Sequence, residues 1–180
     1  LQRNVHAQVA HGQTPNSLLL LEHPHVYTLG RRGQTSDILA DASLLQKLGA
    51  EVHHVDRGGE VTYHGPGQLV GYPIVNLRQW KGGPLKFVQA LERTLISALA
   101  EYGIVAESED RPTGVWVGNA KIAAIGVRVS QGVSMHGFAL NVSLDLSYFK
   151  YIVPLLGHRC HVGIGQTARD DVPKVGKVKA

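Results

Sequence analysis

The sequence contains one cysteine among its 180 residues. A single thiol excludes an internal disulfide framework and a structural zinc site built on several cysteines. The chain also lacks a charged amino terminus followed by an apolar stretch, and its longest apolar run, 18–21, is far shorter than a membrane span. We therefore expect a protein of a reducing compartment, the cytoplasm, with no secretory signal and no membrane partner.

Charged residues make up only 18% of the chain and aromatic residues only 6%. The net charge is +4, but the basic residues are scattered, apart from Lys174, Lys177 and Lys179. Such a mild excess favours acidic protein partners, and without a basic stripe or a binding motif we expect no nucleic-acid partner. The 43% of hydrophobic residues are enough for one domain with one core.

The ten histidines form no pattern typical of a metal site. The pairs His23 with His25 and His53 with His54 lack the spacing of zinc ligands. No glycine-rich phosphate-binding motif followed by a helix is present either. We expect neither a metal nor another cofactor.

One stretch, 57–68, concentrates glycine between two strand-like segments. Glycine lets a backbone approach a ligand closely, and the adjacent Gly58 and Gly59 offer consecutive N–H groups to an anion or a carbonyl oxygen. Arg57 adds a fixed positive fork, and His64 adds a group that ordinarily titrates near neutral pH. The structural alternative is a tight connection between two strands.

Hydrophobic periodicity and turn residues predict the secondary structure. We expect strands over 17–22, 51–55, 68–77, 115–117, 121–129 and 133–142, a helix between Asp41 and Gly49, and a longer helix over 85–102. The longer helix should bury Phe87, Leu91, Leu95, Ala98 and Tyr102. Pro73 indicates that its strand is an edge strand or contains a bulge. Strands and helices mix without regular alternation, which predicts one α/β (α+β) domain over 1–180, with a mixed β-sheet flanked by helices.

Three side chains outside the glycine stretch have reactive potential. Cys160 has basic neighbours that would favour its thiolate, although a small cysteine packed in the core is the alternative. Lys121 begins the apolar run 122–125, where its pKa would be lowered, unless it is a solvated lysine beside a hairpin. Strand alternation would place His136 and Phe138 on one face, in the core or in a pocket.

Several ordered segments resemble the octanoyltransferases of lipoate biosynthesis. They are Arg57 to Gln68, Thr113 to Val117, Lys121 to Gly126, His136 to Asn141, and Asp145 to Phe149. The resemblance extends from about Leu18 to Pro154 and implies a fold similar to the biotin and lipoate protein ligases. It implies transfer of an octanoyl group from acyl carrier protein to a lysine of lipoyl domains, in 2-oxoacid dehydrogenase E2 subunits and the glycine cleavage H protein. The reaction would pass through a cysteine thioester, with no metal and no ATP.

The resemblance also implies roles for individual residues. Lys121 occupies the position of the family's catalytic lysine, which lowers the pKa of the thiol and transfers protons. The cysteine would be Cys160. The substrate wall would consist of Arg57, Gly58, Gly59, Glu60, Val61, Thr62, Tyr63, His64, Ala124, Ile125, Gly126, Gly137, Phe138 and Ala139.

The sequence departs from the family where the nucleophile is expected. The family has a Pro-Cys-Gly step, whereas here Leu155 follows Pro154, and 155–180 is an atypical tail. Leu155 occupies the position where the family has its cysteine, and Cys160 lies further along the chain. A fully extended chain between the two residues would span up to roughly 17 Å. Three functions stay open: transfer through a displaced Cys160, an acyl-binding relative with impaired catalysis, or an ATP-dependent lipoate or biotin ligase. A changed reading frame would also produce such a tail.

Overall fold

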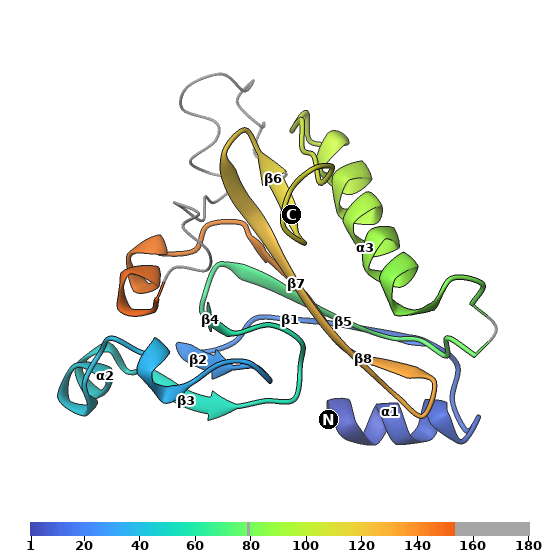
Figure 1. The fold of residues 1–180 in the computed structure, drawn as a ribbon, viewed down its shortest axis with the longest axis horizontal. Helices are drawn as coiled ribbons and strands as arrows, with labels where there is room; N and C mark the ends of the chain where they lie inside the picture. Colours follow the sequence, from blue (N-terminus) through green and yellow to red (C-terminus); the bar gives the residue numbers. More distant parts are fainter. Residues whose placement is uncertain (79, 154–180) are drawn as a thin grey trace, which may run out of the picture.

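The computed structural model describes residues 1–78 and 80–153, which form two β-sheets with helices packed around them (Figure 1). The larger sheet is antiparallel and has the order β1 (Ser17–Leu21), β5 (Gln68–Ile74), β8 (Val133–Asn141), β7 (Ala120–Ser130) and β6 (Val115–Val117). The smaller sheet has the order β3 (Glu51–His54), β2 (Val26–Leu29) and β4 (Val61–His64). Its β2 runs parallel to β3 and antiparallel to β4. The predicted α/β class is confirmed, and the strands are divided between two sheets.

The helices are α1 (Gln2–Ala10), α2 (Ala42–Leu48) and α3 (Gly83–Ala100), with short 3₁₀ helices η1 (Thr35–Asp37) and η2 (Leu146–Tyr151). The caps predicted for α2 are confirmed. Asp41 Oδ1 accepts a hydrogen bond from the N–H of Leu44 at 2.8 Å, and Gly49 ends the helix in the left-handed conformation. None of the helices in 1–78 and 80–153 is both long enough and apolar enough to cross a bilayer.

Helix α3 covers one face of the larger sheet, beside β6 and β7 (Figure 1). Its Leu95 and Leu99 join a core cluster with Ile122, Ala123 and Leu140 of the sheet. The predicted buried face was partly wrong: Ala98 and Tyr102 are exposed, and the buried positions are Phe87, Glu92, Leu95 and Leu99. Tyr102 lies beyond the last helical residue, so it does not continue the stripe that faces the sheet. The buried stripe therefore contains a carboxylate.

Pro73 was expected to mark either an edge strand or a bulge; β5 is an interior strand, so the edge is excluded, and the ladder is irregular beside the proline. The proline is accommodated by a local interruption of the ladder. Gly71 pairs with Phe138, and pairing resumes where the N–H of Ser134 donates to the Val75 carbonyl. Between these two points His136 has φ of +57°, a conformation that side chains other than glycine rarely adopt. The missing N–H of Pro73 and the left-handed His136 thus occur in the same gap of the ladder.

A second core joins the smaller sheet to η2. Tyr27 and Leu29 of β2 pack with Val61 and Tyr63 of β4, and all four side chains are almost fully buried. Tyr63 also stacks on Tyr148 of η2 with ring centroids 4.7 Å apart. This packing fixes η2, after which the described chain ends at residue 153.

Gly137 lies where β8 approaches β5 too closely for a side chain. A Cβ on Gly137 would overlap the Gly71 carbonyl oxygen and Cδ of Pro73, neither of which can rotate away. We expect Gly137→Ala to lower the free energy of unfolding by roughly 1–3 kcal/mol, measured by urea denaturation. In the control Gly82→Ala, the nearest atoms to the new methyl group belong to the side chain of Lys86 at the exposed start of α3, where the side chain has room to shift, so the effect should be smaller. Equal stability of Gly137→Ala and the wild type would contradict the close packing.

Candidate active site

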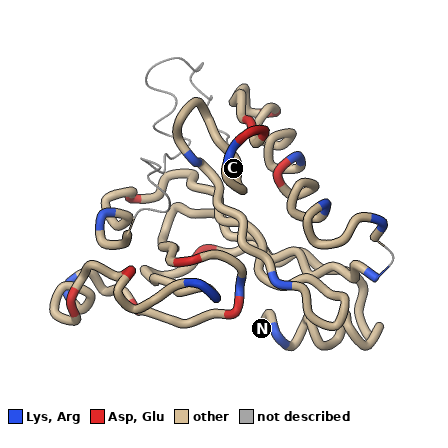
Figure 2. The backbone as a smooth tube through the Cα atoms, in the orientation of Figure 1, with Lys and Arg blue, Asp and Glu red and all other residues tan. Residues whose placement is uncertain are grey.

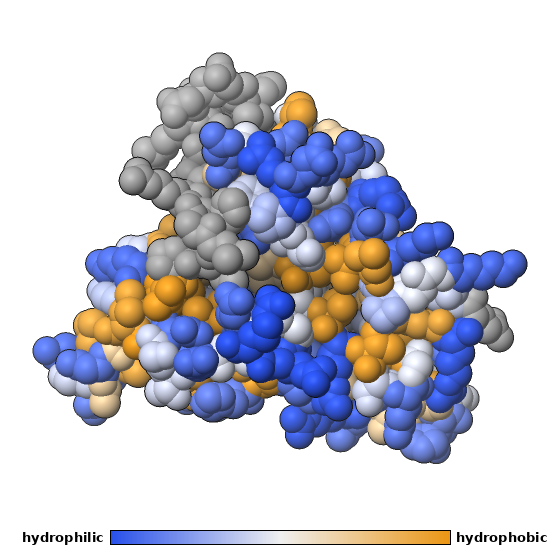
Figure 3. All heavy atoms as spheres, viewed as in Figure 1, coloured by the Kyte–Doolittle hydropathy of each residue, from blue (hydrophilic) through white to orange (hydrophobic). Residues whose placement is uncertain are grey.

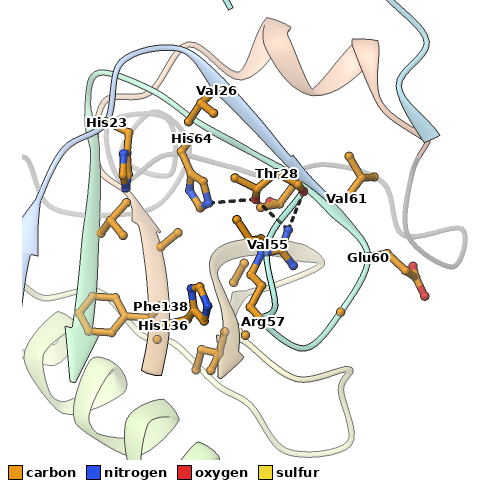
Figure 4. Close-up of a pocket in the computed structure, with 18 of the residues that line it drawn as sticks. His23, Val26, Thr28, Val55, Arg57, Glu60, Val61, His64, His136 and Phe138 are labelled. Atoms are coloured by element: carbon orange, nitrogen blue, oxygen red, sulfur yellow. Dashed lines mark hydrogen bonds between the residues drawn. The ribbon is translucent and has the colours of Figure 1, made fainter. Parts of the chain in front are cut away.

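A cavity of about 1370 Å³ lies between the two sheets. Its wall combines apolar and small residues of the larger sheet with the polar loop that connects β3 to β4 (Figure 4). Residues of the larger sheet that line it include Leu19, Leu21, Val70, Tyr72, Ala124, Ile125, Gly126, Gly137, Phe138 and Ala139. Residues of the loop and the smaller sheet include Val26, Thr28, Arg57, Gly58, Gly59, Glu60, Val61, Thr62 and His64. The cavity is therefore apolar along β7 and β8 and polar beside the loop.

Arg57 is held rigidly at the polar side of this cavity (Figure 4). One of its terminal nitrogens donates to the Thr28 carbonyl at 2.7 Å and to the Thr28 hydroxyl at 2.9 Å, and the other donates to the Gly58 carbonyl at 3.1 Å. Burial lowers the pKa of Arg57 to about 10, so the guanidinium stays charged at neutral pH. Its buried Nε has no hydrogen-bond partner among the described residues.

His64 is buried and held in one tautomer. The side-chain amide of Gln68 donates to Asn141 Oδ1 at 2.9 Å, so the Gln68 oxygen accepts from His64 Nδ1 at 2.7 Å. Burial, together with the nearby charge of Arg57, lowers the pKa of His64 to about 4. The sequence-based interpretation of His64 as a group that titrates near neutral pH was therefore wrong. The neutral ring presents its unprotonated Nε2 toward the Thr28 hydroxyl, 3.5 Å away.

The low pKa of His64 predicts that acid destabilises the fold. The unfolded chain binds a proton on His64 as pH falls through the ordinary value of 6.5, whereas the folded protein does so only near pH 4. The unfolded state therefore binds more protons between these values, and stability is lost as pH falls. From this group we expect the free energy of unfolding to be about 2 kcal/mol lower at pH 5 than at pH 7.5, measured by urea titration.

The matched variants for this measurement are His64→Gln and His54→Gln. His64→Gln should lose that part of the pH dependence, whereas His54→Gln should keep it because His54 is exposed. The same pH dependence in His64→Gln and the wild type would contradict a depressed pKa for His64.

His136 projects into the cavity from the interruption in β8 (Figure 4). Its Nε2 donates to Asp56 Oδ1 at 2.7 Å, and the other oxygen of Asp56 accepts from Arg128. Burial and the charge of Arg57 lower the pKa of His136 to about 4. The His136 ring contacts Tyr72 of β5, whereas the Phe138 ring covers Gly71 of β5. Gly71 and Tyr72 are adjacent in the strand and therefore face opposite sides of the sheet. The prediction that His136 and Phe138 share a face was therefore wrong, because the left-handed residue breaks the alternation.

Lys121 lies near the start of β7 and is half-buried. Its Nζ donates to the Thr113 carbonyl at 3.0 Å and lies 4.9 Å from the centroid of the Trp116 ring. Burial lowers the pKa of Lys121, while the carboxylate of Glu92 opposes that shift. Of the two alternatives from the sequence, the structure favours the lysine against apolar surface over the solvated lysine.

The cavity brings together most of the residues that the sequence analysis placed at the site. Lys121 and all the predicted wall residues line it except Tyr63, which is fully buried in the second core. Gly58 donates its N–H to the Val127 carbonyl at 3.1 Å. The sequence had suggested that this N–H is offered to a ligand, but in the structure it is already bonded. Cys160 lies outside the residues that the structure describes.

Sequence reasoning missed the supporting residues of the site, among them Thr28, Gln68 and Glu92. The partners of Arg57 and His64 come from positions whose side-chain direction is set by strand pairing, which the sequence does not reveal. Glu92 had a detectable signal, because it precedes the buried Leu95 by one helical turn.

Charged residues are dispersed over the described surface. Figure 2 shows Lys and Arg alternating with Asp and Glu along α3 and around the smaller sheet, with no continuous basic stripe. In Figure 3, apolar side chains appear in the middle of the face between hydrophilic regions. Within 1–78 and 80–153, no group of three or more His, Cys, Asp or Glu side chains is placed to bind a metal ion.

The family described as lipoyl protein ligase A/B catalytic domain matches residues 1–162. An octanoyltransferase of Solibacter usitatus is 54% identical over 154 residues, which are 86% of this chain and 70% of that protein. An octanoyltransferase of Bacteroides fragilis is 48% identical over 155 residues, 83% of this chain and 70% of that protein. A mitochondrial octanoyltransferase of Arabidopsis thaliana is 48% identical over 143 residues, 79% of this chain and 61% of that protein.

Two solved structures share the fold. A lipoate-protein ligase A bound with ATP superposes with a TM-score of 0.78 at 17% identity, over 96% of this chain and 72% of that one. A putative lipoate protein ligase from T. acidophilum with bound lipoic acid superposes with a TM-score of 0.72 at 15% identity, over 92% of this chain and 71% of that one. The expected similarity to the fold of the lipoate protein ligases is confirmed.

Proposed function

The chain belongs to the family of lipoyl protein ligase A/B catalytic domains and is an acyltransferase of protein lipoylation, and we propose that the octanoyl group passes through a thioester on Cys160. Acyl carrier protein is the proposed donor, and the acceptor is a lysine of a lipoyl domain. We take 1–180 as one catalytic domain.

The observation that carries this proposal is the continuous wall between Lys121 and the Arg57 loop. Gly126 lies against this loop, because a Cβ on Gly126 would be 3.4 Å from Cδ of Arg57. Lys121 precedes Gly126 on the same strand, and that stretch of β7 spans roughly 16 Å. Between them the wall is made of the small or apolar residues Ala124, Ile125, Gly137, Phe138 and Ala139. The space suits an eight-carbon chain whose carbonyl lies near Lys121.

Burial of the acyl chain supplies most of its binding free energy. Each methylene group removed from water contributes roughly 0.8 kcal/mol. Arg57 and His64 stand at the other end of the wall, where their fixed hydrogen bonds keep the loop in place. The loop therefore limits the chain length that the cavity accepts.

The proposed reaction has two half-reactions. The Cys160 thiolate attacks the carbonyl carbon of the octanoyl thioester, the bond to the carrier's sulfur breaks, and the Lys121 ammonium gives that sulfur a proton. The amine of the target lysine then attacks the acyl-enzyme and loses a proton to Lys121. The bond to Sγ of Cys160 breaks, which leaves an amide on the target and restores the thiolate and the ammonium.

The partners follow from the same proposal. The donor is octanoyl-acyl carrier protein, and the acceptors are lipoyl domains of 2-oxoacid dehydrogenase E2 subunits and the glycine cleavage H protein. The net charge of +4 suits acidic partners of this kind. Neither nucleic acid, membrane, metal nor ATP has a part in the proposed reaction, and the cytoplasm stays the predicted compartment.

The test is the intact mass of the protein after incubation with octanoyl-carrier protein, before and after hydroxylamine. We expect an octanoyl adduct that hydroxylamine removes and that a lipoyl domain discharges without ATP. An adduct that forms only from free octanoate and ATP would instead identify a ligase. Tight binding of the donor by folded protein, with no adduct, would identify an acyl-binding relative.

A further inference from the structure

Glu92 is a buried carboxylate in the apolar stripe of α3, and only 8% of its surface is exposed. Its neighbours on the stripe are Leu95 and Leu99, which pack into the core. Burial of a carboxylate is unfavourable unless hydrogen bonds or an opposite charge compensate. The carboxylate of Glu92 therefore needs a hydrogen-bond donor or a positive charge that compensates its burial. None of the proposed catalytic steps involves Glu92.

Its direct partner is the turn that precedes β6. Glu92 Oε1 accepts a hydrogen bond from the N–H of Gly114 at 2.9 Å, and this bond is buried. Gly114 has φ of +138°, and a Cβ there would lie 2.6 Å from the Ala123 carbonyl oxygen and 3.2 Å from Cε of Lys121. The turn is thus pressed between Glu92 on one side and the aliphatic part of Lys121 on the other.

The same turn holds the ammonium group of Lys121. The carbonyl of Thr113, the residue before Gly114, accepts the hydrogen bond from Lys121 Nζ at 3.0 Å. One buried contact of Glu92 therefore fixes the peptide segment whose oxygen locates the lysine. Loss of that contact would free the turn and with it the position of Nζ.

The charged groups around Lys121 come from α3 and from the loop before β6. Glu92 is on α3, and its charge favours the protonated form of Lys121. Arg111 lies over the Trp116 ring at 5.6 Å from its centroid, on the ring that Lys121 also contacts, but its charge is matched by Glu107 at 2.7 Å. The balance at Lys121 is therefore between burial, which disfavours the ammonium, and Glu92, which favours it.

We propose that Glu92 is a positioning residue for Lys121: through the Gly114 N–H it fixes the Thr113 carbonyl that binds Nζ of the lysine. This inference rests on the proposed function of Lys121 in acyl transfer. Its physical content, the coupling between Glu92 and Lys121, can be measured without any turnover.

The first measurement is the titration of Lys121 by NMR after ¹³C reductive methylation, with the signal assigned by its absence in Lys121→Arg. Glu92→Gln keeps the shape and an oxygen that can accept from Gly114, but it removes the charge. We expect the pKa of Lys121 to fall in this variant, because the charge of Glu92 opposes the lowering by burial. The alkaline limb of the transfer rate against pH should move to lower pH by the same amount. A purely structural role would move neither value.

The control is Glu109→Gln, which removes an exposed carboxylate from the loop before β6 but leaves the contact with Gly114 and the ion pair of Arg111 with Glu107, and should not shift the titration of Lys121. Glu92→Met serves if the glutamine variant does not fold, and it should shift the titration in the same direction. An unchanged Lys121 titration in folded Glu92 variants overturns the inference, whatever the activity. A shifted titration in a protein that forms no acyl adduct upholds the coupling and overturns the proposed function instead.

Discussion

Replacing Cys160 with alanine should abolish the hydroxylamine-sensitive octanoyl adduct and reduce transfer by roughly 10³–10⁶-fold. The reason is that the chain has a single cysteine, so a thioester can form on Cys160 alone. An octanoyl group on Lys121 would be an amide, which hydroxylamine leaves intact. The measurement combines the intact mass of the protein with the rate of octanoyl transfer to a lipoyl domain.

Cys160→Ser is the matched variant, because an oxygen nucleophile has a much higher pKa than a thiol and forms a more stable ester. We expect slow formation of an adduct and very slow discharge. If Cys160→Ser or Cys160→Ala transfers octanoyl groups at the wild-type rate, the acyl-enzyme on Cys160 is excluded. The pocket would then act on the two bound substrates directly.

Lys121→Met should lower the transfer rate by roughly 10²–10⁴-fold, the contribution typical of a positioned acid and base. Methionine retains the apolar length that packs against Gly114 but loses the hydrogen bond to Thr113 and the charge over Trp116. Without the ammonium the thiolate of Cys160 is less favoured, so its alkylation by iodoacetamide should require higher pH.

Lys121→Arg separates charge from proton transfer. Arginine keeps a positive charge, but it does not release its proton at ordinary pH. We expect alkylation of Cys160 to remain close to wild type in this variant while transfer stays low. Alkylation profiles that coincide in the wild type and Lys121→Met would show that Lys121 does not act on the thiol.

The sequence was sufficient for most elements and for most of the cavity wall, because these depend on local signals, but it did not predict strand β4 inside the glycine stretch. Asp41 and Gly49 bound α2 through capping groups that are visible in the sequence. The glycine stretch and the β7–β8 segments matched ordered motifs, and their residues do line one cavity. Tyr63 was placed in that wall with its neighbours, but its hydroxyl contacts His25 at 2.6 Å within the second core.

The remainder depended on pairings between distant segments, which no local pattern encodes. Pro73 indicated an edge or a bulge, and the sequence did not decide between them because the interruption of the ladder is formed with residues near His136 on another strand. His64 was expected to titrate because its burial depends on β5 and β8, which also supply Gln68 and Asn141. In both cases the sequence showed the chemical property, the missing N–H of Pro73 and the titratable ring of His64. The effect of that property depended on neighbours from distant strands.

The order of strands in the larger sheet has a consequence for synthesis on the ribosome. β1 pairs with β5 through contacts such as Ser17 with Ile74, and β5 completes its pairing only with β8, where Gln68 meets Asn141. The hairpin of β7 and β8 can form locally, but β1 and β5 stay without the central strand until β8 has been translated. During this interval the growing chain presents unpaired strand edges and the leucines of β1, a state in which nascent chains associate with one another and with chaperones. The cavity wall on β7 and β8 is thus also the segment whose synthesis ends the exposure of the amino-terminal half.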